Sequence, residues 1–183
     1  MERWAGQMGQ DSRAVPATGG QCDGCGFDYD TVEPRAVATA LVQGAIAVAD
    51  LLRAGSSQLA VRAQPSVWSP LEYGCHLRDV LLVQRERLLL ARRVEQPEMV
   101  SMGRDERVEH ERYGQQDPQD VARQLVDAAG LFANALEGLS DDAWQRTVVY
   151  NYPQRSVRSL SWMAQHTLHE VRHHHLDISR QLA

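Results

Sequence analysis

The sequence predicts an all-α protein, a four-helix bundle, and three observations lead to this expectation. Apolar residues recur at helical spacing over long segments, N-cap residues followed by proline begin two of these segments, and long polar connections separate the later ones. Amphipathic helices bury their apolar faces most simply against one another. The expected helices cover residues 32–53, 70–93, 117–138 and 159–183.

The first helix is predicted by an apolar stripe that includes Val37, Leu41 and Leu52. Pro34 lies in its first turn, where the N–H that proline lacks would have no helical partner anyway. A Gly-Ser-Ser run at residues 55–57 is a typical stop signal. We therefore expect this helix to end close to residue 53.

Capping signals predict where the other helices begin. Ser69 is an N-cap, Pro70 follows it, and Glu72 completes a capping box. Asp117 and Pro118 repeat the cap-proline pattern at the third helix. The fourth segment contains no glycine or proline, and most of its residues tolerate a helix well.

The connections are long and polar. Residues 94–116 mix acidic and basic side chains with proline and glycine, which is typical of a functional lid or a disordered loop, with a short charged helix as a further alternative. Residues 140–158 predict a turn followed by an extended piece at 147–153. Residues 1–30 are expected to form a flexible tail, which leaves residues 31–183 as one bundle domain.

Composition narrows the class of protein. The net charge of −5 and pI of about 5.8 argue against a nucleic-acid-binding surface. No stretch resembles a membrane helix of about 20 apolar residues or a secretory signal, so we expect a cytoplasmic protein with no membrane partner. All 19 basic residues are arginine, a bias typical of GC-rich genomes such as those of actinomycetes.

Cys22 and Cys25 form a Cys-x-x-Cys-Gly turn, which is half of a zinc knuckle. The second half is missing, because Cys75 is the only other cysteine. A knuckle completed by Cys75 and a histidine, and a redox pair, are both alternatives. The favoured interpretation is a turn with a minor structural role.

A histidine-rich stretch in the fourth helix is the main functional signal. Residues 161–178 contain five of the seven histidines. Glu170 and His174 are four residues apart and share one helix face, whereas His169 and His173 form a second pair rotated by about 100°. Pairs at this spacing hold metals on helices, and His76 in the second helix can complete a site from the bundle interior.

Two ligand sets remain open on spacing alone. His76, Glu170 and His174 give two imidazoles and one carboxylate, whereas the competing triad is His76, His169 and His173. Three protein ligands leave a coordination position for water or substrate, as in catalytic sites. The first set suits zinc best, with nickel, iron or manganese as alternatives.

The chain resembles the DinB superfamily of metal-binding four-helix bundles, which includes mycothiol- and bacillithiol-dependent S-transferases and mycothiol-dependent maleylpyruvate isomerase. The resemblance spans residues 32–183 and depends on two motifs, Trp68-Ser69 with His76-Leu77, and Glu170-x-x-x-His174-x-x-Asp177-Ile178. It implies helices that run up, down, down and up, and it selects His76, Glu170 and His174 as metal ligands. Many members of the superfamily have histidine at the position of Glu170, whereas the isomerase-like branch has glutamate. At this position the sequence therefore resembles the isomerase-like branch.

The resemblance also implies a reaction. A divalent metal would bind the thiol of mycothiol or a similar small thiol and lower its pKa, so that the thiolate attacks a small electrophilic molecule. His166 and Asp177 are the candidate catalytic side chains, with His166 as a general base or a support for the ligands. The candidate contacts for the thiol cofactor are Arg78, Tyr113, Arg158 and Arg172.

Two other functions remain open. In a hydrolase of the same fold, metal-bound water would replace the thiol. A non-catalytic, stress-related or binding bundle would retain the fold without a reaction. The oligomeric state, monomer or homodimer, also stays open.

Overall fold

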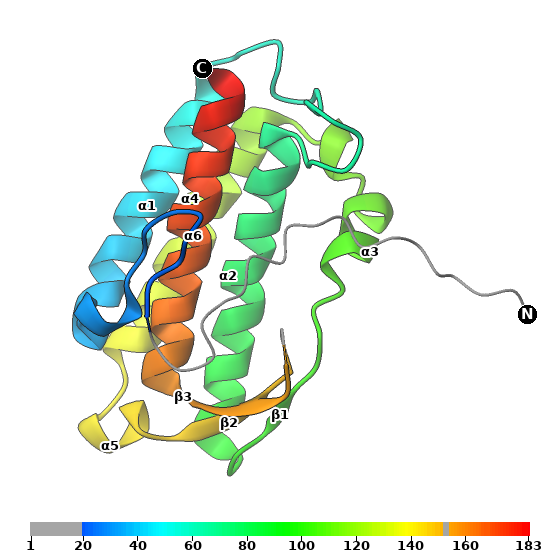
Figure 1. The fold of residues 1–183 in the computed structure, drawn as a ribbon. Coiled ribbons are helices and arrows are strands. Elements are labelled where there is room, and N and C mark those ends of the chain that lie inside the picture. Colours follow the sequence, from blue (N-terminus) through cyan, green and yellow to red (C-terminus); the bar gives the residue numbers. More distant parts are fainter. Residues whose placement is uncertain (1–19, 152–153) are drawn as a thin grey trace, which may run out of the picture.

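Four long helices form the body of the protein. The computed structural model describes residues 20–151 and 154–183. The axes of the four helices are roughly aligned, and neighbouring helices run either parallel or antiparallel (Figure 1). This architecture confirms the predicted all-α bundle, and the helix bounds lie within a few residues of those expected. They are α1 Val37–Arg53, α2 Pro70–Arg93, α4 Pro118–Glu137 and α6 Leu160–Leu182.

The helices run up, down, down and up, as expected (Figure 1). α1 and α2 each pack mainly against α4 and α6, so α1 and α2 lie diagonally across the bundle. Because α2 and α4 point the same way, the chain between them must travel back along the length of the bundle. This arrangement places α2 beside α6, which brings together the two helices that carry the candidate ligands.

The predicted caps are present at the helix starts. Ser69 Oγ accepts from the backbone N–H of Glu72, and the Glu72 carboxylate accepts from the backbone N–H of Ser69 at 2.7 Å. Asp117 accepts from the N–H groups of the first turn of α4. Such reciprocal bonds satisfy backbone donors that have no partner within the helix. These capping residues therefore set where α2 and α4 begin.

α1 and α6 approach each other closely at Gly44. A Cβ atom at this position would lie 2.7 Å from Cγ1 of Val171, closer than side-chain carbons pack. The missing side chain therefore allows the two helices to touch. Val171 is next to Glu170 in the sequence, so this contact helps to set the position of the candidate site.

The connection from α2 to α4 is folded onto the bundle. It contains β1 Glu98–Met99, α3 Arg104–His110 and η3 Tyr113–Gln115. The short charged helix was one of the predicted alternatives and is confirmed, whereas the disordered loop is wrong for this segment. Asp79 of α2 holds it, accepting from Tyr113 Oη at 2.6 Å and from Arg107 at 3.0 Å.

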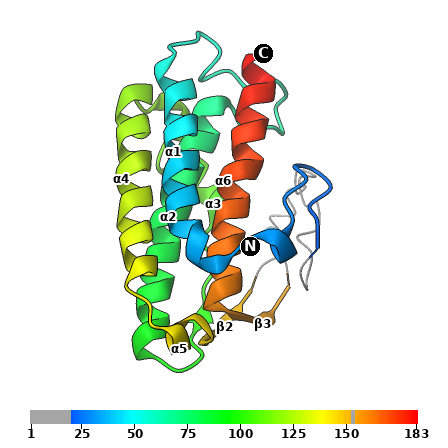
Figure 2. The same ribbon diagram turned by 90° about the vertical axis from the view of Figure 1, so that its left-hand side faces the viewer.

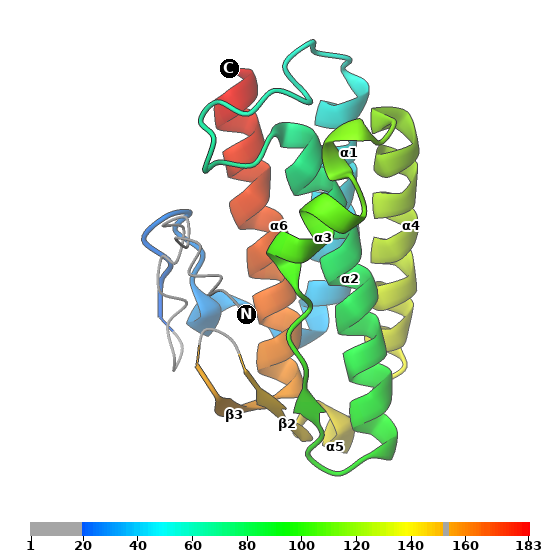
Figure 3. The ribbon, with the colours of Figure 1, turned by 90° about the vertical axis from the view of Figure 1, so that its right-hand side faces the viewer.

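A small sheet closes one end of the bundle (Figure 3). After the short helix α5 Asp141–Trp144, β2 Thr147–Tyr150 pairs antiparallel with β3 Ser156–Ser159 and parallel with β1. The sequence predicted the extended piece that is β2, but not its two partners. Residues 152–153 of that predicted piece lie outside the described residues.

The segment that precedes α1 packs along the outer side of α6 (Figures 2 and 3). Within residues 20–31, Gln21 bridges to Asp28, and Cys22, Phe27 and Tyr29 are buried. The expectation of a flexible tail over residues 1–30 is therefore wrong for 20–30, because apolar side chains attach this part to the bundle. Its first 19 residues lie outside the described residues.

One segment of the described chain, Pro34–Arg53, has the length and apolar composition of a membrane span, so the expectation that no stretch resembles one is wrong. Its inner residues, including Leu41 and Leu52, are fully buried against the other helices. Core helices of globular proteins have the same composition, so this feature is weak evidence for a membrane.

Candidate metal centre

His76 of α2 faces Glu170 and His174 of α6. The Nε2 atom of His76 lies 3.7 Å from Oε2 of Glu170, and Nε2 of His174 lies 3.6 Å from the same oxygen. One donor atom from each residue falls within 4.8 Å of the other two. The structure thus brings together the ligand set that the resemblance selected.

These residues fit a divalent metal. Ligands about 2.0–2.1 Å from zinc at tetrahedral angles lie about 3.3 Å from one another, so the two separations from Glu170 need to shrink by only a few tenths of an ångström. The same separations are too long for hydrogen bonds. The side chains of His76 and His174 are 4% and 13% exposed, so both donors are largely shielded from water.

The electrostatics of the centre favour a charged carboxylate. Burial alone would raise the pKa of Glu170, but the facing imidazoles of His174 and His76 hold that pKa well below its usual range. Burial lowers the pKa of His76, which keeps this imidazole neutral. Glu170 and His76 are thus in the protonation state that a metal requires of its ligands, whereas His174 would release a proton on binding one.

Asp177 supports His174 from the side away from Glu170. Its Oδ2 atom lies 3.0 Å from Nδ1 of His174. Although burial opposes it, the two carboxylates, Asp177 first, raise the pKa of His174 to about 9. A carboxylate on the second ring nitrogen orients a histidine ligand and increases its basicity. The structure therefore places Asp177 where it can orient the His174 ring.

Replacing Asp177 by asparagine should weaken metal binding by about 10- to 100-fold, since the imidazole loses the charge that orients it. The affinity can be measured by competition with a chromophoric chelator. Asp127→Asn on the exposed side of α4 is the matched control. Equal affinities in both variants would contradict the positioning role.

His166, the predicted general base, lies one turn before Glu170 and is buried. Its Nδ1 atom is 2.9 Å from the Tyr29 hydroxyl, and its ring stacks on Trp162 at 4.7 Å between centroids. Nε2 is 3.9 Å from Oε1 of Glu170. Sequence reasoning missed Tyr29, because it belongs to the segment expected to be flexible.

The four side chains predicted to contact the thiol cofactor all contact other side chains of the protein in the structure. Arg78 bonds to Asp79 at 2.8 Å, and the fully buried Tyr113 donates to the same carboxylate. Arg158 and Arg172 lie over the rings of Trp162 and Phe27. These contacts explain where the four side chains are held, and their contact with a cofactor stays a prediction.

His169, His173 and the cysteines form neither the competing triad with His76 nor a knuckle with Cys75. His169 and His173 face Cys22 and Cys25, so the competing triad with His76 is not assembled. Cys75 points elsewhere, with its thiol 3.8 Å from the Tyr113 carbonyl. A knuckle completed by Cys75 is therefore wrong.

Comparison with known proteins identifies the family and a similar fold. The family model of the DinB superfamily matches residues 40–178, which include all three candidate ligands. A solved structure described as "YfiT from Bacillus subtilis is a probable metal-dependent hydrolase with an unusual four-helix bundle topology" superposes with a TM-score of 0.71. It is 17% identical, and the match covers 84% of this chain and 91% of that one. No curated protein sequence matches.

Proposed function

The chain belongs to the DinB superfamily, and from that premise we propose that it is a metal-dependent enzyme acting on a small electrophilic molecule. His76, Glu170 and His174 would hold one divalent metal, with zinc the best chemical match. The observation that supports this most is the convergence of three donors from two helices, which leaves a coordination position for a nucleophile. A metal bound there would lower the pKa of a coordinated thiol or water.

The first candidate nucleophile is a low-molecular-weight thiol such as mycothiol, which makes the protein an S-transferase or lyase. Its support is the Glu170-x-x-x-His174 form of the helix motif, which resembles the branch that uses such thiols. Arg78, Arg158, Arg172 and Tyr113 stay the proposed contacts for the thiol cofactor. Asp177 would act through His174, as a positioning residue rather than on the substrate.

The second candidate nucleophile is water, and its support is the description of YfiT as a probable metal-dependent hydrolase. This reaction needs a group that accepts a proton. Burial lowers the pKa of His166, so its imidazole is neutral and able to accept one. In that role Nδ1–H of His166 would donate to the Tyr29 hydroxyl oxygen at 2.9 Å, which leaves Nε2 free to accept the proton.

We further propose a cytoplasmic location and small-molecule partners. Cys22, Cys25 and Cys75 form no disulfide in the described part of the chain, which suits a reducing compartment. The net charge of −5 gives no support to a nucleic-acid partner.

Metal-loaded protein should be assayed against a panel of alkylating electrophiles and small esters, with and without an added thiol. Turnover that requires the thiol supports S-transfer, and turnover without it supports hydrolysis. His76→Ala is the matched negative control, because it removes the ligand supplied by α2. Metal bound at the centre but no turnover in either arm would contradict the enzyme proposal and favour a binding bundle.

A further inference from the structure

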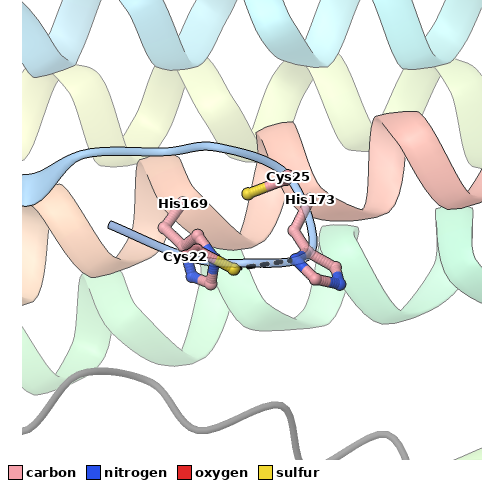
Figure 4. A group of neighbouring side chains, drawn as sticks. All are labelled: Cys22, Cys25, His169 and His173. Carbon is pink, nitrogen blue, oxygen red and sulfur yellow. Dashed lines mark hydrogen bonds between the residues drawn. The ribbon is translucent and has the colours of Figure 1, made fainter. Parts of the chain in front are cut away.

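A second cluster of metal-compatible side chains lies on the other face of α6. Cys22 and Cys25 on the N-terminal segment and His169 and His173 on α6 point into one shared space (Figure 4). One donor atom from each of the four lies within 4.8 Å of all the others. Two thiols and two imidazoles are a ligand set characteristic of structural zinc.

The spacing of the cluster agrees with tetrahedral coordination. A sulfur about 2.3 Å and a nitrogen about 2.0–2.1 Å from zinc lie about 3.6 Å apart at the tetrahedral angle. The Sγ atom of Cys22 is 3.6 Å from Nδ1 of His173. Because that separation also suits a hydrogen bond between thiol and imidazole, the inference depends on all four residues rather than on this pair.

His169 gives an independent indication. Its side chain is only 5% exposed, yet neither ring nitrogen has a hydrogen-bond partner among the described residues. An imidazole has one donor and one acceptor nitrogen when neutral, and buried groups of this kind are nearly always paired. A metal ion among the four residues would satisfy one of these nitrogens directly.

We propose that Cys22, Cys25, His169 and His173 bind a structural zinc ion that attaches the N-terminal segment to α6. Four protein ligands complete a tetrahedral shell, so this site has no position for substrate. It is distinct from the centre formed by His76, Glu170 and His174, although both use residues of α6. Both cysteines precede residue 40, so this site adds to the region that matches the superfamily.

Two other interpretations of the cluster are weaker. His166, His169 and Glu170 also lie close together, but Glu170 is needed at the first centre and His166 is already bonded to Tyr29. A redox-active pair needs an accessible thiol, whereas Cys22 is buried.

The proposed zinc has a consequence for the neighbouring centre. The same segment carries Tyr29, whose hydroxyl meets His166 and whose carbonyl accepts from Gln165 at 3.2 Å. Apart from these contacts, a hydrogen bond from Arg180 to the Gly24 carbonyl at 3.3 Å also attaches the segment to α6. A zinc ion would therefore fix Tyr29 beside the proposed catalytic side chains.

The test is the zinc content of the full chain, purified without a histidine tag or chelator and under reducing conditions. We expect about two zinc ions per chain in the unmodified protein. Cys22→Ser and Cys25→Ser should each lose about one of them, whereas His76→Ala should lose the other. Cys75→Ser and His175→Ala, which alter residues outside the cluster, should keep both.

A second measurement uses the unmodified chain, so its main result does not depend on the folding of a variant. Replacing zinc by cobalt(II) in the unmodified chain should produce the near-ultraviolet charge-transfer absorption of thiolate-bound cobalt. His76→Ala should keep this absorption, since the cysteine ligands remain. Absence of the absorption in the cobalt-loaded protein, or unchanged zinc content in both cysteine variants, would overturn the proposal. Loss of zinc from His76→Ala alone would leave the first centre supported.

Discussion

Glu170→Gln should remove the metal of the first centre and abolish the activity that depends on it. The substitution keeps the size of the side chain but removes the charge that faces both His76 and His174. Replacing a group that only supports a ligand already costs about 10- to 100-fold in metal affinity, so the loss of a ligand charge should exceed about 100-fold. Metal titration followed by calorimetry, together with turnover at saturating metal, measures both effects.

The matched control is Glu137→Gln, which changes an exposed carboxylate at the end of α4. It should retain wild-type affinity and turnover. The cysteine-containing site should keep its zinc in Glu170→Gln, because none of its four residues is altered. A variant that binds metal at the first centre as tightly as the unmodified chain would eliminate Glu170 as a ligand.

Asp79→Asn should destabilise the fold by about 3 kcal/mol at neutral pH, the usual cost of breaking a buried ion pair. Asp79 is 5% exposed and accepts from Arg78, Arg107 and Tyr113. The substitution leaves a largely buried guanidinium without its anion and loosens the connection between α2 and α4. Urea unfolding at pH 7 measures the change in the free energy of unfolding.

The loss of stability caused by Asp79→Asn should depend on pH. Although burial opposes it, hydrogen bonds from Tyr113 and Arg78 lower the pKa of Asp79. An unfolded aspartate has a pKa of about 3.9, so the unfolded chain binds more protons just below that pH. The stabilisation is complete above about pH 4 and is lost as the pH falls through the folded pKa. The difference between Asp79→Asn and the unmodified chain should therefore shrink in acid. Asp127→Asn should show little effect at either pH.

The helices were predictable because their signals are local. Caps such as Ser69 and Asp117 and the apolar stripes act within one or two turns, so they can be read without knowing the fold. The small sheet was not predictable, because β1 has two residues and its pairing with β2 joins segments about 50 residues apart. A pattern so short carries no periodicity.

The candidate site was predictable only in part. The i, i+4 pairs on α6 are visible in the sequence, but spacing on one helix does not show which face meets α2. The structure resolves this, since Glu170 and His174 face His76 whereas His169 and His173 face the cysteine turn. Tyr29 had no local signal, because it reaches His166 only when the N-terminal segment packs on α6.

α6 carries candidate ligands of both proposed metal sites, and its close contact with α1 at Gly44 and Val171 helps to set its position. A helix moves as a rigid body, so any axial rotation of α6 displaces both ligand pairs together and in the same sense. Metal affinity depends on tenths of an ångström, whereas packing energy depends on the sum of many weak contacts. Residues on α1 that contact no candidate ligand would thus help to set the metal affinity of both proposed sites, and zinc at the cysteine turn would restrain the geometry of the candidate centre.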